Sequence, residues 1–165
     1  MRILRLTPAL LVYTGMIPFI VSVLFIYRYD GLLDAHPSMA AGGAAEWIAM
    51  RLQLALASLL IYAAAILSFL GGIRWGLEIG ENPQTPRGSV LVFSVLAPLG
   101  GWGATLFGLM VESSAKLFLG YAMMFALLLV WDIGATSLPR WFKRLRIVGS
   151  IAAMASLLSV AWLFV

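Results

Sequence analysis

Long apolar runs separated by short polar segments dominate the pattern of the chain. Five runs stand out, at about residues 6–27, 52–74, 89–111, 117–138 and 147–165. A helix of about twenty-two residues rises roughly 33 Å, enough to cross a hydrocarbon core of about 30 Å. The pattern therefore predicts an all-α polytopic membrane protein: one domain over residues 1–165, built as a bundle of five transmembrane helices.

Composition supports the membrane class. Apolar residues make up 62% of the chain and charged residues only 11%, whereas a soluble domain carries about 25% charged residues to keep its surface wetted. So few charges can cap a bundle at two membrane faces but cannot cover a globule. The chain has no cysteine, which excludes disulfides and thiolate metal sites.

The basic residues predict an orientation. With five spans, eight Lys and Arg fall on the side of the N-terminus and three on the other side. The eight are Arg2, Arg5, Arg74, Arg87, Arg140, Lys143, Arg144 and Arg146; the three are Arg28, Arg51 and Lys116. The positive-inside rule then places the N-terminus in the cytoplasm and the C-terminus in the periplasm of a bacterial inner (plasma) membrane. The same rule explains the net charge of +4, so the predicted partner is the lipid bilayer and not nucleic acid.

Two charged residues are predicted at one depth inside the membrane boundary. Arg51 and Arg74 bracket the second run and are about 34 Å apart along a helix, so Arg74 lies at the inner interface. Asp132 lies about 24 Å along the fourth helix, slightly inside the same interface. Arg74 and Asp132 therefore form a candidate intramembrane ion pair. The alternatives are an arginine that extends to the lipid headgroups and an aspartate that faces interface water.

Glu78 is a second candidate partner for Arg74. It follows Arg74 by four residues, so it lies one turn away if the second helix continues past Gly72.

Two glycine-rich segments predict close approach of a helix or a ligand. The candidate residues are Gly71, Gly72, Trp75 and Gly76 in the second run and Pro98, Gly100, Gly101 and Trp102 in the third. Gly100, Ala104 and Gly108 recur every four residues, which is typical of a helix-packing face. Trp102 is predicted near the middle of the membrane, where it either fills space left by glycine or forms the wall of a hydrophobic pocket.

No catalytic or cofactor motif is evident. His36 is the single histidine, so no intramembrane histidine pair can hold a haem, and the acidic residues near it match no metal motif. No serine, histidine and acid occur together, and no H-E-x-x-H or phosphate-binding loop is present. The sequence predicts a protein that is not an enzyme and has no cofactor.

Three segments resemble landmarks of one family. They are Leu11 to Phe19, which ends Gly15-Met16-Ile17-Pro18-Phe19, then Ser68-Phe69-Leu70-Gly71-Gly72-Ile73-Arg74-Trp75-Gly76-Leu77, and finally Leu138-Pro139-Arg140-Trp141-Phe142-Lys143-Arg144-Leu145-Arg146. The chain resembles the bacterial and mitochondrial membrane family known as domain of unknown function 3429, which includes transmembrane protein 69. The resemblance implies a five-helix inner-membrane protein and carries no catalytic residue.

Two functional hypotheses remain open. The first is a non-enzymatic accessory, assembly or structural subunit that packs against other membrane proteins or a second copy through the small-residue faces of helices three and five. The alternative is a binder or transporter of a small hydrophobic or amphiphilic molecule, such as a lipid or a quinone-like compound. Its pocket would lie around Pro98, Gly101 and Trp102, with Arg74 and Asp132 at the mouth.

Overall fold

The fold is an all-helical bundle. The computed structural model describes residues 3–35, 43–111, 113–134 and 138–165. Its helices are α1 (Ile3–Ala35), α2 (Gly43–Glu81), α3 (Gly88–Met110), α4 (Ala115–Gly134) and α5 (Arg140–Trp162). Among the described residues these are five helices, each long and apolar enough to cross a membrane. The predicted fold class is therefore confirmed.

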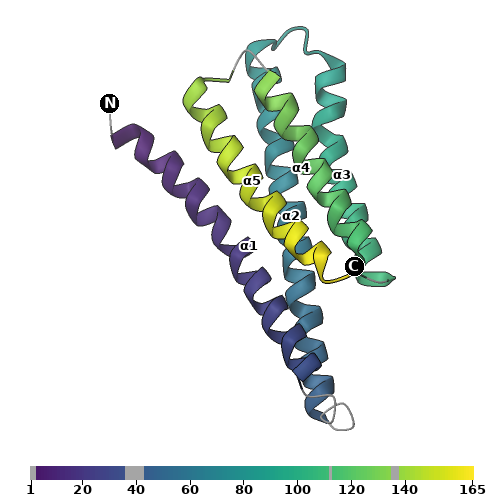
Figure 1. Cartoon of the computed structure of the whole chain (residues 1–165). Coiled ribbons are helices and arrows are strands. Elements are labelled where there is room, and N and C mark those ends of the chain that lie inside the picture. The colour runs from purple at the N-terminus through teal and green to yellow at the C-terminus, as the bar shows by residue number, and fades with distance from the viewer. Residues whose placement is uncertain (1–2, 36–42, 112, 135–137) are drawn as a thin grey trace.

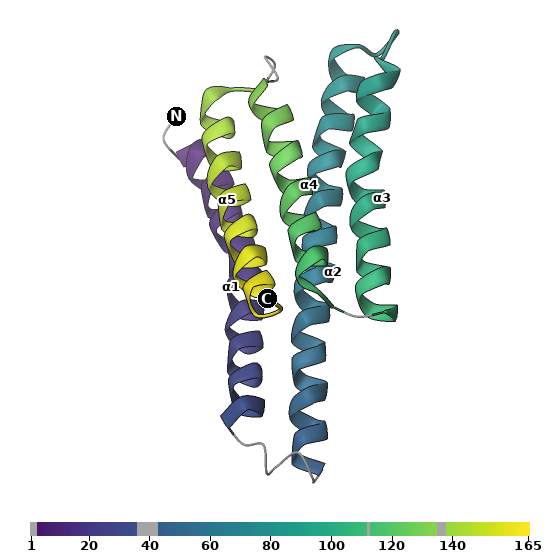
Figure 2. The same cartoon turned by 45° about the vertical axis from the view of Figure 1, so that its right-hand side comes forward.

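Consecutive helices run in opposite directions, and α2 lies at the centre of the arrangement (Figure 1). The most extensive contact joins α2 to α3, and α2 also touches α1 and α4. The α4 helix packs mainly on α5, which in turn packs on α1. Toward its N-terminal end α1 leans away from α2, and α5 lies beside it there (Figures 1 and 2).

The first two helices are longer than the uncharged runs predicted. The α2 helix has 39 residues, about 58 Å, which exceeds one membrane thickness. Figure 2 shows the joined ends of α1 and α2 extending beyond the other three helices. The first two runs, 6–27 and 52–74, leave a polar segment between them, yet Asp30 and Asp34 of that segment lie on α1 and Glu46 lies on α2. A helix can continue into water, where charges cost nothing, so uncharged runs mark the membrane and not the helix ends.

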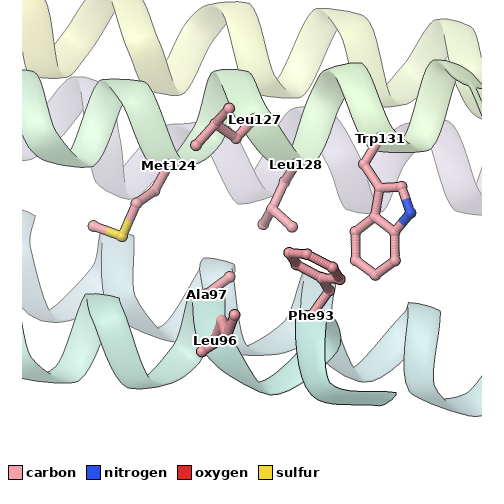
Figure 3. Close-up of a pocket in the computed structure, with 7 residues that line it drawn as sticks. All are labelled: Phe93, Leu96, Ala97, Met124, Leu127, Leu128 and Trp131. Atoms are coloured by element: carbon pink, nitrogen blue, oxygen red, sulfur yellow. The ribbon is translucent and has the colours of Figure 1, made fainter. Parts of the chain in front are cut away.

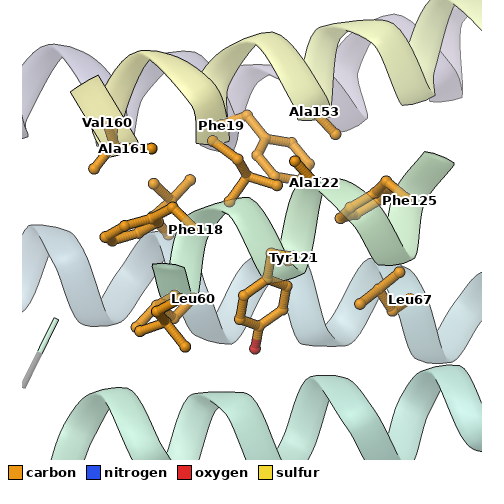
Figure 4. Close-up of a cluster of buried hydrophobic side chains, with 14 of the residues drawn as sticks. Phe19, Leu60, Leu67, Phe118, Tyr121, Ala122, Phe125, Ala153, Val160 and Ala161 are labelled. Atoms are coloured by element: carbon orange, nitrogen blue, oxygen red, sulfur yellow. The ribbon is translucent and has the colours of Figure 1, made fainter. Parts of the chain in front are cut away.

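Aromatic and aliphatic side chains from α1, α2, α4 and α5 form the core. Figure 4 shows α4 between α5 and α2, with Phe118 and Phe125 among the buried side chains. The ring of Phe19 on α1 meets that of Phe125 edge-on, at a centroid distance of 6.0 Å. Tyr121 points instead toward α3, where its hydroxyl donates to the Gly101 carbonyl at 2.6 Å.

Small residues allow α2 and α3 to approach closely. A Cβ added to Gly71 would collide with the backbone carbonyl oxygen of Ser94 and lie 3.2 Å from Pro98 Cδ. A Cβ added to Gly101 would lie 3.2 Å from the side chain of Leu67 on α2. Glycine is therefore required at Gly71, where the two backbones meet, whereas a Cβ at Gly101 would need its neighbours on α2 to shift by a few tenths of an ångström.

Candidate functional site: a buried charge cluster beside an apolar cavity

Three charged side chains from three helices meet near one end of the bundle. Asp132 of α4 accepts hydrogen bonds on Oδ2 from Nε of Arg146, at 2.7 Å, and from Nη2 of the same α5 residue. On the other side, Nε of Arg74 on α2 lies 3.8 Å from Oδ1 of Asp132. This distance allows a salt bridge but is too long for a hydrogen bond. All three residues are buried, so the cluster holds two positive charges and one negative charge away from bulk solvent.

Arg74 also contacts an aromatic ring. Its Cζ lies 4.4 Å from the centre of the Trp131 ring, a cation–π arrangement. Nε of Arg74 is buried and has no hydrogen-bond partner. The structure thus brings together the two residues of the predicted ion pair, while the strongest bonds of Asp132 go to a different arginine.

Arg146 is the partner that the sequence reasoning missed, because it was counted with the basic loop that follows α4. The buried positions of α5 include Arg146, Ser150, Ala153, Leu157 and Val160. These spacings of three and four residues follow the inward stripe of a helix. If this stripe is extended back toward the start of α5, it predicts that Arg146 lies in the interior and not in the loop.

Glu78 forms a separate and local ion pair. Its carboxylate accepts hydrogen bonds from Nε and Nη2 of Arg87 and from the Arg87 backbone N–H, at 2.7–3.1 Å. The Asn82 side chain donates a further bond at 3.1 Å. These bonds and the negative charge raise the pKa of the Arg87 guanidinium above its usual value. Glu78 therefore does not pair with Arg74, although α2 does continue past Gly72; the carboxylate instead closes the connection between α2 and α3.

An apolar cavity lies next to Arg146. It has a volume of about 450 Å³, within the range of about 300–1,000 Å³ typical of small-molecule sites. Its walls come from α1, α2, α4 and α5: Pro8, Leu11, Val12, Gly15, Met16, Phe19, Ile66, Phe69, Leu70, Ile73, Phe125, Phe142, Leu145, Arg146, Gly149 and Ser150. Arg146 and Ser150 supply the polar side chains of this lining, so one charged region adjoins a hydrocarbon-like space.

A second apolar space lies between α3 and α4 (Figure 3). It has a volume of about 420 Å³ and is lined by Phe93, Leu96, Ala97, Met124, Leu127, Leu128 and Trp131. The Phe93 and Trp131 rings meet edge-on at 6.1 Å. All of its side chains except the indole of Trp131 are wholly apolar, so the groove suits a hydrocarbon chain and offers little to orient a polar ligand.

The glycine-rich candidates divide into two groups. Gly71, Pro98 and Gly101 lie in the contact between α2 and α3, and a Cβ on Gly100 would lie 3.0 Å from Met124 Sδ on α4. In contrast, nothing lies within 4 Å of a Cβ added to Gly72 or Gly76. Trp75 is also exposed, at 43%. The first group serves helix packing within this chain, and the second faces outward.

Trp102 lies in neither of the two positions predicted for it. Its side chain is 62% exposed on the outer face of α3, so it neither fills the space beside the glycines nor lines either cavity described above. The physical reason is the helix period: Gly101 faces α2, and the next residue is rotated by about 100° toward the surroundings. Neither cavity described above is lined by Pro98, Gly101 or Trp102, so the pocket expected around these three residues stays a prediction.

No metal centre is evident in the described ranges. No group of three or more acidic or histidine side chains is close enough there to hold an ion. His36 lies outside the described residues.

Comparison with known proteins identifies the family. The sequence pattern of a family described as "Protein of unknown function (DUF3429)" matches residues 5–162, nearly the whole chain. The chain belongs to the DUF3429 family. Among curated relatives, the DUF3429 chain is 40% identical over 100 residues to "Transmembrane protein 69" of Xenopus tropicalis. It is 34% identical over 99 residues to the protein of the same name from Mus musculus.

The matched regions are partial. Each covers 58% of this DUF3429 chain and 38% of the relative, so the matched region is well under half of those longer proteins. No solved structure matches the chain. The resemblance to this family and the membrane character of the chain are thus both confirmed.

Proposed function

We propose that this membrane protein binds one amphiphilic molecule in the cavity between α1, α2, α4 and α5, and does so without catalysing a reaction. The observation that carries the proposal is the juxtaposition of an apolar cavity of about 450 Å³ with the buried Asp132–Arg146 pair. Ionisable residues buried among membrane-spanning helices are rare and mark functional sites, and here Arg74 and Arg146 carry one positive charge more than Asp132 balances. The apolar walls suit a hydrocarbon chain, and the Arg146 side chain in the lining suits a polar head.

A cavity-filling variant tests the proposal. Met16 lines the cavity, so Met16→Trp should occupy its volume. Met123 is 61% exposed on α4, so Met123→Trp adds the same side chain outside the cavity. We expect protein purified from its native membrane to retain one bound amphiphile per chain by native mass spectrometry. Met16→Trp should lose that molecule and Met123→Trp should keep it; equal retention by both variants would contradict a ligand in this cavity.

A second candidate function is that of an accessory or structural subunit of a larger membrane assembly. The exposed Trp102 on the outer face of α3 favours it, because aromatic residues are frequent at the centres of protein interfaces. The small-residue face of α3 supports it less: a Cβ on Gly108 would collide with Leu117 and approach Leu60 within this chain. Mild-detergent purification should recover a partner or a second copy with the wild-type chain but not with Trp102→Ala; recovery of a lone monomer would count against this role.

We place the protein in a bacterial inner membrane with a cytoplasmic N-terminus and a periplasmic C-terminus. The proposal is supported by the excess of Lys and Arg at the end that carries the N-terminus and the α2–α3 and α4–α5 connections. Because the natural chain has no cysteine, a single cysteine in place of Gln84, which lies in the α2–α3 connection, gives a clean label. It should react with a membrane-impermeant maleimide only after the cells are opened; reaction in intact cells would reverse the orientation.

A further inference from the structure

The polar part of the cavity lining has a hydrogen-bond donor without an acceptor. Ser150 lines the cavity and is only 2% exposed, yet its Oγ has no hydrogen-bond partner. Other serines in the bundle behave differently: Ser94 donates to the Val90 carbonyl and Ser68 to the Ala64 carbonyl of their own helices. An unpaired buried hydroxyl costs free energy. The Oγ itself is closed off from solvent, so a group in the cavity reaches it once the Ser150 side chain turns toward the space that the residue lines.

The charge count in the same region favours an anion. Arg74 and Arg146 together carry two positive charges, and Asp132 supplies one negative charge. Arg146 binds Asp132 through Nε and Nη2, so its Nη1 takes no part in that pair. Glu78 cannot supply the missing charge, because Arg87 and Asn82 occupy its carboxylate. A buried cation without a full countercharge is costly, and an anionic ligand would remove that cost.

The charge lies partway along the apolar cavity, because Phe142, one turn before Arg146 on α5, also lines it. Ser150 follows Arg146 by one helical turn, so both side chains lie on one face of α5. Phe125 lines the cavity seven residues before Asp132 on α4, about 10 Å away along the helix. A molecule with its head at Arg146 and Ser150 would therefore extend a hydrocarbon chain toward Phe125 and Phe19.

We propose that the cavity is specific for amphiphiles with an anionic headgroup, a carboxylate or a phosphate, whose oxygens accept hydrogen bonds from Arg146 and Ser150. This inference rests on the proposed function and adds the class of ligand to it. A fatty acid and a lipid phosphate share the required chemistry, and the experiment below separates them.

The test compares three ligands that share one hydrocarbon chain. The full-length protein is placed in nanodiscs of phosphatidylcholine, and hexadecanoate, hexadecyl phosphate or uncharged hexadecanol is added. Binding is measured as a one-to-one adduct by native mass spectrometry and as a rise in the thermal unfolding temperature. We expect at least one anionic ligand to bind at least about tenfold more tightly than hexadecanol, because hydrogen bonds to a charged group are the strong ones. The better of the two anionic ligands identifies the headgroup.

Variants assign the headgroup site. Ser150→Ala removes only the unpartnered hydroxyl and should weaken anion binding severalfold to about tenfold, whereas the control Ser68→Ala removes a hydroxyl on the exposed face of α2 and should leave it unchanged. Arg146→Gln should abolish the preference for anions; if it fails to fold, Ser150→Ala still tests the site. Hexadecanol binding as tightly as both anions would overturn the anionic specificity while leaving the cavity as a binding site. Failure of all three ligands to bind wild-type protein would overturn both the specificity and the proposed function.

Discussion

Two ion pairs lie near the same end of the bundle, and they differ in how completely their charges are satisfied. In the Glu78–Arg87 pair, one carboxylate meets one guanidinium, with the Arg87 backbone and Asn82 as further donors. The Arg87 side chain is 64% exposed, so water hydrates the rest of its charge. In the second site, a single Asp132 carboxylate lies between two buried arginines. In the first pair the two charges balance, and the pair fixes the connection between α2 and α3. The second site has one positive charge more than its carboxylate balances, and hydrogen-bond donors without acceptors.

The difference shows which ion pair is suited to ligand binding. A saturated pair holds backbone segments together and offers nothing to a ligand. An unsaturated pair next to a cavity costs stability in the empty protein, a cost that binding can reverse. Both sites join a carboxylate to arginine, so the contrast lies in burial and in the count of partners, and variants can test it.

Removal of the central carboxylate should have the largest effect. Asp132→Asn leaves Arg74 and Arg146 buried without a countercharge, and breaking a buried pair in this way costs about 3–5 kcal/mol. Glu78→Gln removes the same charge from a pair whose arginine is mostly exposed, so its cost should be clearly smaller. The free energies of unfolding are measured by SDS titration in mixed micelles. Equal losses for the two variants would show that the two sites do not differ in burial.

Removal of both partners should recover part of that loss. In Asp132→Asn combined with Arg146→Gln, one of the two uncompensated cations is gone, and Arg74 keeps its contact with Trp131. Residues in direct contact show coupling energies of about 0.5–3 kcal/mol, so the double variant should be more stable than Asp132→Asn alone by about 1 kcal/mol or more. Strict additivity of the two single losses would contradict the direct Asp132–Arg146 bond.

Added salt should change the stability contributions of the two ion pairs by different amounts. Ions screen exposed charges and screen buried ones much less, so the loss caused by Glu78→Gln should shrink as sodium chloride is added. The loss caused by Asp132→Asn should stay nearly constant over the same range. Thermal unfolding of the wild type and both variants in a non-ionic detergent is the measurement. A strong salt dependence at Asp132 would mean that water reaches the cluster.

Sequence pattern and helix geometry account for the bundle and for part of the charge cluster. The apolar runs predict five helices, and the rise per residue places Arg74 and Asp132 at one depth. The burial of Arg146 was not predicted, because residue counts place a charge near the start of a helix at the membrane surface. Its burial depends on which side of α5 faces α4. The cavity could not be predicted from the sequence either, because it depends on the tilt of α1 against α2. Trp102 was misplaced for a related reason: depth can be counted along a helix, but rotation about its axis needs the neighbouring helices.

Ser150→Ala should have the smallest effect on stability among these variants. It tests whether the Ser150 hydroxyl has no hydrogen-bond acceptor within the protein. Because Ser150 Oγ bonds to nothing in the protein, its removal should not lower the free energy of unfolding of the ligand-free chain and should raise it slightly, since the unpaired hydroxyl is itself costly. The comparison is Thr105→Val, which deletes a buried hydroxyl that donates to the Gly101 carbonyl at 2.9 Å and contacts the Tyr121 hydroxyl. That variant should lose about 1 kcal/mol. A loss at Ser150 as large as that at Thr105 would mean that its hydroxyl is already bonded in the empty protein, and the contrast between the complete and incomplete charge sites would then rest on the arginines alone.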